Sequence, residues 1–159
     1  MEAVKLGEIK KELSQRDPQE LVELCLKISK YKKENKELLI YLLFEQDHES
    51  GYIIKVKEEI DLAFSEINKS SFYYAKKGVR KALRITQKHI KYSGIKTTEI
   101  ELFAHFLTNF KFLSRYFPKS MVWEKLNETI LKKIEKALQQ LHPDLQHDYD
   151  DLLQSLVKK

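Results

Sequence analysis

The sequence predicts an all-α fold, and three of its features favour helices over strands. Gly and Pro number only four and three in 159 residues, whereas β folds and nucleotide-binding α/β folds need more tight turns and close backbone approaches. Apolar residues recur at helical spacing along most of the chain. Capping residues mark where the segments start and stop. We expect about seven to eight antiparallel amphipathic helices, arranged as a short α-solenoid or an irregular bundle.

The first third of the chain predicts three helices. A short helix is expected over residues 4–13, and Asp17-Pro18-Gln19-Glu20 supplies the N-cap, the first-position proline and the third-position acid of a second helix. Cys25 lies beside the apolar stripe of that helix and is interpreted as a small core residue. Glu34-Asn35-Lys36 is expected to separate it from a third helix over residues 38–43. The stripe of the second helix comprises Leu21, Leu24, Ile28 and Tyr31.

The middle of the chain predicts a polar loop over residues 45–51, a fourth helix over 52–68, and a fifth that Ser70-Ser71 caps and Gly94 ends. Gly78 falls inside the fifth helix. A mid-helix glycine costs about 1 kcal/mol relative to alanine, so we expect a helix to approach it closely. The inward stripe of the fifth helix comprises Ala75, Val79, Ala82, Leu83, Thr86 and Ile90.

Three further helices are expected toward the C-terminus. Thr97-Thr98 is predicted to cap a sixth helix over residues 99–116, whose apolar residues almost encircle it. Such a helix is normally buried at the centre of a fold. Ser120 is expected to begin a seventh helix that runs to Leu141, and His142-Pro143 to begin the last one.

Length and composition predict a single helical domain over residues 1–159. Cys25 is the only cysteine, which excludes an intrachain disulfide and a cysteine-based zinc site. Charges occupy the N-terminal positions where a signal peptide would be apolar, and the longest apolar run, residues 38–44, is too short for a membrane span. We therefore expect a protein of the reducing cytoplasm, of bacterial type, with no membrane span and no cofactor.

Three segments carry a resemblance to a known family. They are Lys10-Lys11-Glu12-Leu13-Ser14, Leu21-Val22-Glu23-Leu24, and the run from Tyr31 to Leu39. Over this first quarter, the chain resembles small all-helical bacterial proteins that are grouped as a domain of unknown function. The resemblance implies a helical fold, and it implies neither an activity nor any site residue.

Charge is strongly segregated along the chain. Residues 67–98 contain nine Lys and Arg and no acidic residue, so that this segment carries +9, while the whole chain carries +5 and the remainder therefore −4. At about 100° per residue, Lys77, Lys81, Arg84 and Lys88 lie opposite the apolar stripe of the fifth helix. Arg80 and Lys91 flank them, and the six cations form a predicted ridge about 20 Å long.

A regular row of cations suits an anionic partner, and the function that we expect is binding. The favoured hypothesis is a protein-interaction or scaffold domain that binds an acidic protein through the basic helix face. Nucleic-acid binding through the same face is the alternative, because phosphate contacts supply affinity without base readout. A solvated helix face, partly neutralised by Glu58, Glu59, Asp61 and Glu66 of the preceding helix, needs no partner at all.

Residues 84–89 have the spacing Arg-x4-His, which is similar to the motif of the small helical HEPN ribonucleases. The resemblance implies that Arg84 and His89 would share a catalytic site. Ile85 stands where that family usually has a polar residue, and the two side chains project about 140° apart on a helix. A helical ribonuclease is therefore only the third hypothesis.

Two other groups of polar residues are candidates for chemistry. His142, His147, Asp148 and Asp151 are a weak candidate metal site, because His147 and Asp151 are four residues apart on one predicted helix. Helix-dipole interactions explain acids at such positions without a metal. Glu101, His105 and Thr108 form a polar seam on the sixth helix. No phosphate loop or nucleophile motif accompanies them, so an enzyme is not expected.

Overall fold

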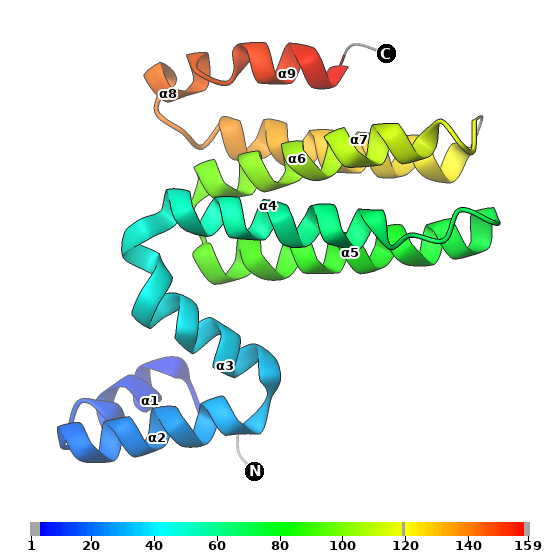
Figure 1. The fold of residues 1–159 in the computed structure, drawn as a ribbon. Coiled ribbons are helices and arrows are strands. Elements are labelled where there is room, and N and C mark those ends of the chain that lie inside the picture. The colour runs from blue at the N-terminus through cyan, green and yellow to red at the C-terminus, as the bar shows by residue number, and fades with distance from the viewer. Residues whose placement is uncertain (1–3, 119, 158–159) are drawn as a thin grey trace. The chain divides into compact units, whose positions relative to one another are not determined.

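The computed structural model describes residues 4–118 and 120–157, and every regular element in these residues is helical. The prediction of an all-α fold is confirmed. The chain divides into two compact units, one ending at Phe44 and one beginning at Glu45 (Figure 1). The expectation of a single domain over residues 1–159 stays a prediction. The two units are described separately below.

The N-terminal unit contains α1 (Leu6–Leu13), α2 (Pro18–Tyr31) and α3 (Lys33–Ile40), and a π-helical turn follows over Tyr41–Glu45. The predicted capping box of α2 is confirmed: Asp17 Oδ1 accepts from the Glu20 amide at 2.8 Å, and the Glu20 carboxylate accepts from the Asp17 amide at 3.2 Å. The break expected at Glu34–Lys36 lies instead at Lys32, whose backbone is extended. Asn35 is helical and donates to the Ile28 carbonyl at 3.0 Å, which ties the start of α3 to α2.

The apolar stripe predicted for α2 is not buried. Leu24, Ile28 and Tyr31 are exposed, and Leu21 is half-buried. The interpretation of Cys25 as a core residue is wrong, since its side chain is exposed. Three short helices enclose too little volume to surround a whole stripe, so helical periodicity is present here without the burial that usually accompanies it.

The C-terminal unit contains a 3₁₀ turn (Gln46–His48), α4 (Glu49–Ser65), α5 (Phe72–Ser93), α6 (Lys96–Ser114), α7 (Met121–Leu138), α8 (Pro143–His147) and α9 (Asp150–Val157). Consecutive long helices run antiparallel, with α4 and α5 forming one hairpin and α6 and α7 the next (Figure 1). The polar loop expected over residues 45–51 is wrong, because the 3₁₀ turn and the start of α4 occupy it. In short helical turns, the backbone N–H and C=O groups form hydrogen bonds with near neighbours in the chain.

The sixth helix is the centre of this unit, as its sequence predicts. It packs against α4, α5, α7 and α9. Phe103, Phe106 and Phe110 are almost completely buried, and the Phe106 and Phe110 rings stack with centroids 6.1 Å apart. Phe110 also meets the buried Trp123 of α7 edge to face at 5.0 Å. Phe112, which belongs to the same apolar run, is exposed.

Some of the predicted helix ends of this unit are confirmed and others are wrong: α4 covers residues 49–65 and not 52–68, and α7 ends at Leu138 and not at Leu141. Ser71 caps α5 by accepting from the Tyr74 amide, and Gly94 ends the helix with a φ of 68°. The cap expected at Thr97-Thr98 is wrong, because α6 begins earlier, after Ile95. Thr98 instead donates to Glu49 at 2.5 Å, which joins α6 to the start of α4. The prediction of a single last helix is also wrong, since turn residues at 148–149 divide that segment into α8 and α9.

Candidate functional site

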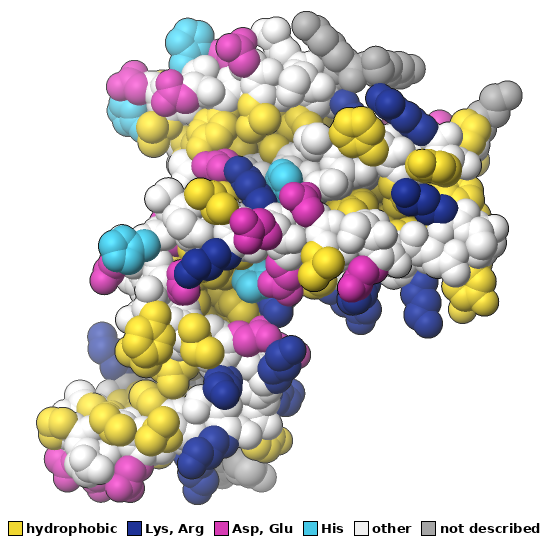
Figure 2. Space-filling model, viewed as in Figure 1, with side chains coloured by type: hydrophobic (Ala, Val, Ile, Leu, Met, Phe, Trp, Pro, Cys, Tyr) yellow, Lys and Arg dark blue, Asp and Glu magenta, His cyan; other side chains and the backbone are white. Residues whose placement is uncertain are grey.

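The candidate site lies on α5, whose two faces differ in burial. Ala75, Val79, Ala82 and Thr86 are buried and follow the predicted inward stripe, while Leu83 and Ile90 are half-buried at its margins. The opposite face carries the basic ridge, defined as Lys77, Arg80, Lys81, Arg84, Lys88 and Lys91. Five of these six side chains are exposed, and Lys88 is half-buried. Lys and Arg side chains project from the edge of the unit that α5 occupies (Figure 2).

The members of the ridge differ in how far native carboxylates neutralise them. Lys81 pairs with Glu66 at 3.2 Å, and both side chains remain more than half exposed. Lys88 interacts with another residue of the protein, so it is not a free cation. Lys91 makes no ion pair with any described residue, and the same holds for Lys77, Arg80 and Arg84, which follow one another at i, i+3 and i+7 along the helix. These three residues are called the free row below.

The free row borders a shallow depression of about 550 Å³. Lys76, Tyr73 and Leu83 complete its lining, so cationic groups stand around an aromatic ring and a leucine. Tyr73 is 70% exposed and meets the Tyr74 ring edge to face at 5.5 Å. The prediction of the ridge from charge alone did not include Lys76, Tyr73 or Leu83, because only the surface shape shows that these residues border the same space.

The acidic residues between positions 58 and 66 have different partners. Glu66, which directly follows α4, pairs with Lys81 of the ridge. Glu59 lies 2.9 Å from Nε2 of His89, and Asp61 lies 2.6 Å from Nε2 of His105. None of these three acids pairs with Lys77, Arg80 or Arg84, which leaves the free row available to another anion.

The structure does not bring Arg84 and His89 into one site. His89 is held between α4 and α5, because its Nδ1 shares a hydrogen bond of 2.7 Å with the Tyr52 hydroxyl and its Nε2 faces Glu59. Only 12% of the His89 side chain is exposed. Arg84 stands in solvent with the free row. This arrangement gives His89 a packing role between two helices and does not form the shared pair that the ribonuclease motif implies.

The weak candidate metal ligands near the C-terminus are also separated. His142 and His147 are exposed, as are Asp148 and Asp151. His147 Nδ1 lies 2.5 Å from Asp150. The chain turns after α8, so that Asp150 is the partner of His147 in place of the expected Asp151. Among the residues that the structure describes, no three His, Cys, Asp or Glu side chains are grouped closely enough to hold a metal ion.

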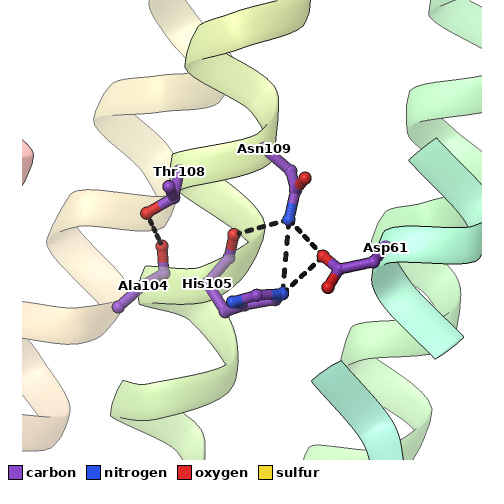
Figure 3. Close-up of polar contacts among 5 residues, drawn as sticks. All are labelled: Asp61, Ala104, His105, Thr108 and Asn109. Atoms are coloured by element: carbon purple, nitrogen blue, oxygen red, sulfur yellow. Dashed lines mark hydrogen bonds and ion pairs between the residues drawn. The ribbon is translucent and has the colours of Figure 1, made fainter. Parts of the chain in front are cut away.

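The polar seam on α6 forms a connected cluster with α4 (Figure 3). Nε2 of His105 lies 2.6 Å from Asp61 Oδ1, and the Asn109 amide donates to the same oxygen at 2.7 Å. Thr108 donates to the Ala104 carbonyl at 3.0 Å, and Glu101 pairs with Lys57 at 2.8 Å. The three seam residues therefore face different partners.

Asn109 could have been found from the sequence, since it follows His105 by one helical turn. Asp61 could not, because it is 44 residues away from His105. The cluster of Asp61, His105 and Asn109 joins α4 to α6, and its hydrogen bonds are made within itself. Asp61 and Asn109 also border a depression of about 470 Å³.

The Tyr149 phenol has a pKa that clearly departs from its usual value. Burial, followed by the negative charges of Glu101 and Asp148, raises the pKa of Tyr149 above its ordinary value of 10.0. Tyr149 belongs to the turn between α8 and α9 and is remote in sequence from the ridge. Its shift reflects packing of the C-terminal helices and indicates no catalytic group.

Comparison with models of protein families, with curated proteins and with solved structures gave no match to this chain. Within the described residues, no helix has both the length and the apolar character that crossing a lipid bilayer requires.

Proposed function

We propose that this protein is a helical interaction domain that binds an acidic protein partner through the basic ridge of α5. The observation that supports the proposal most directly is the free row: Lys77, Arg80 and Arg84 are exposed, aligned on one helix face, and without a carboxylate partner among the described residues. Unpaired cations in a row create a positive potential that attracts and orients an anionic surface. Two of the three are arginines, which bind carboxylates in a bidentate manner and lose little hydration in doing so.

The lining of the depression favours a protein over a nucleic acid. Tyr73 and Leu83 offer apolar contacts directly beside the free row. An amphipathic acidic helix can use both kinds of contact, with apolar side chains in the depression and carboxylates on the arginines. A phosphate backbone would use only the cations.

The extent and the surroundings of the ridge also favour a protein. From Lys77 to Lys91 the ridge is about 20 Å long at 1.5 Å per residue, and it occupies a single helix. The residues outside 67–98 carry a net charge of −4. The excess positive charge is thus local to this segment, which suits a compact acidic protein segment better than a long polyanion.

Fluorescence anisotropy with defined probes tests the proposal. The first probe is a labelled helix-forming peptide with glutamates on one face and leucines on the other, and the second and third are a short DNA duplex and a single-stranded RNA. The variant combines Lys77→Glu, Arg80→Glu and Arg84→Glu. The control combines Lys125→Glu, Lys132→Glu and Lys136→Glu, which reverses three exposed lysines on α7 and changes the net charge equally.

We expect the acidic peptide to bind the wild-type protein, and the ridge variant to lose at least about tenfold in affinity. Three exposed ion pairs at about 0.5 kcal/mol each give about 1.5 kcal/mol, which corresponds to that factor. The control variant should bind nearly as well as the wild type. Equal losses in both variants would show that net charge alone attracts the peptide. Tighter binding of the duplex or the RNA, lost in the ridge variant, would reassign the ridge to nucleic-acid binding.

A further inference from the structure

A second candidate binding surface lies in the N-terminal unit, in a groove of about 520 Å³ between α1 and α2. Its walls come from one face of each helix. Ile9 and Leu13 of α1 are one turn apart, as are Glu20 and Leu24 of α2. The groove is therefore formed by two helix faces that regular helical spacing turns toward the same space. It is independent of α5 and of the proposed function.

The floor of the groove is apolar and open to solvent. Val4, Ile9, Leu13 and Leu24 line it and remain 58%, 44%, 41% and 38% exposed. Single exposed apolar residues are common on proteins, but four that converge on one groove are typical of an interaction site. Two helix faces with an apolar floor form a site of the kind against which a third helix packs in a helical bundle.

The rim of the groove is predominantly acidic. Four glutamates border it, against the two cations Arg16 and Lys27, which gives the lining a net charge of −2. The four are Glu8, Glu12, Glu20 and Glu23.

These four glutamates differ in what they do within the fold. The Glu8 carboxylate accepts from the Lys5 amide at the start of α1, and Glu20 completes the capping box of α2 and pairs with Arg16 at 3.3 Å. Glu12 and Glu23 are exposed, and their side chains make no ion pair or hydrogen bond with any described residue. They stand on opposite walls of the groove, where a partner placed between the helices would meet both of them.

We infer that this groove binds a basic amphipathic helix of a partner protein. An apolar stripe on that helix would cover the floor, and lysines or arginines along both margins of the stripe would meet Glu12 and Glu23. Because α1 has eight residues, about 12 Å of helix, the groove accommodates about two turns of the partner. The charge of the rim selects the occupant, since an acidic helix of the same apolar pattern would place its carboxylates against glutamates.

Titration of the full-length protein with labelled peptides tests this inference. The probe is a helix-forming peptide of about 16 residues, or roughly 24 Å of helix, with leucines on one face and lysines at both margins. One comparison peptide has glutamate in place of each lysine, and another has serine in place of each leucine. The groove variant combines Glu12→Lys and Glu23→Lys, which leaves Glu8 and Glu20 at the helix starts unchanged. Its control combines Glu128→Lys and Glu135→Lys, two exposed acids of α7.

We expect the basic peptide to bind the wild type and the α7 control alike, and to bind the groove variant at least about fivefold more weakly, since two exposed ion pairs at about 0.5 kcal/mol each are lost. Neither comparison peptide should bind comparably. Binding should persist in the ridge variant of α5, so that failure of the two proposals can be told apart. Circular dichroism of each variant verifies that helical content is unchanged.

Three results would overturn the inference. They are the absence of binding by the basic peptide, equal binding by its acidic counterpart, and equal weakening in the groove and control variants. Sedimentation velocity over a range of concentrations tests whether a second copy of the chain, and not a partner protein, occupies the groove. Self-association that disappears in the groove variant would show that a second copy of the chain fills the groove.

Discussion

Replacing Gly78 by alanine perturbs the tightest contact of α5. The sequence predicts that a helix approaches this mid-helix glycine closely; a close approach exists, but it is made by Ile67 and not by a helix. A Cβ atom at position 78 would lie 2.6 Å from Cγ1 of Ile67 and 3.1 Å from its Cγ2. The neighbour belongs to the connection between α4 and α5 and not to another helix. Ile67 is only 7% exposed, so its branched side chain has little room to move.

Two opposing terms determine the effect of Gly78→Ala. Alanine in a helix interior stabilises by about 1 kcal/mol relative to glycine. Forcing an extra methyl group into a packed site costs about 1–3 kcal/mol. We therefore expect Gly78→Ala to lower the free energy of unfolding by about 1 kcal/mol. In an Ile67→Ala background, the obstructing Cγ atoms are gone, and the same change should stabilise by about 1 kcal/mol. The coupling energy between the two sites is then about 2 kcal/mol.

Urea unfolding of the four proteins of this double-mutant cycle measures the coupling. Trp123 is the only tryptophan and is buried, so its fluorescence reports unfolding of the C-terminal unit. Gly51→Ala in the first turn of α4 is the matched control, because no atom lies within 4 Å of its added Cβ, and it should not destabilise. If Gly78→Ala stabilised the protein equally in both backgrounds, the packing argument would be refuted.

Three further predictions concern single positions. Gly94→Ala should destabilise by about 1 kcal/mol in urea unfolding, because a φ of 68° disfavours any residue with a Cβ, and an unchanged midpoint would contradict this. The raised pKa of Tyr149 means that the folded state holds its proton more tightly, so its contribution to stability is complete below about pH 10 and is lost as the pH rises through the raised value. Tyr149→Phe should therefore reduce the loss of stability between about pH 9 and about pH 11, and Glu101→Gln should reduce it less; a Tyr149→Phe profile identical to the wild type would exclude this account. Cys25 should react with a thiol reagent in the native protein at nearly the rate seen in urea, and strong protection without denaturant would contradict its exposure.

The sequence predicted helix ends best where the capping residue lies within one turn of the helix end. The capping box at Asp17, the cap at Ser71 and the left-handed Gly94 are all confirmed, because each depends on residues within one turn. The cap at Thr97-Thr98 failed for a tertiary reason. The Thr98 hydroxyl finds a better partner in Glu49, which lies 49 residues earlier in the chain and reaches Thr98 only in the folded unit.

Periodicity predicted burial correctly for α5 and α6 and incorrectly for α2. The α5 stripe faces other helices of the C-terminal unit, which exclude water from Ala75 and Val79. The α2 stripe has the same spacing, yet Leu24 and Ile28 remain exposed. An amphipathic pattern states which side of a helix can be buried. Whether it is buried depends on a covering element, which the pattern does not contain.

The sequence by itself determined the all-α class, the confirmed caps of α2 and α5, and the basic face of α5, because these depend on composition and on neighbours within one or two helical turns. Only the tertiary structure decided which cations of that face stay unpaired. Glu66 reaches Lys81 from 15 residues away and leaves Lys77, Arg80 and Arg84 free. Ion pairs and surface depressions depend on which helices pack together, and that packing follows from the summed burial of many residues that no short segment encodes.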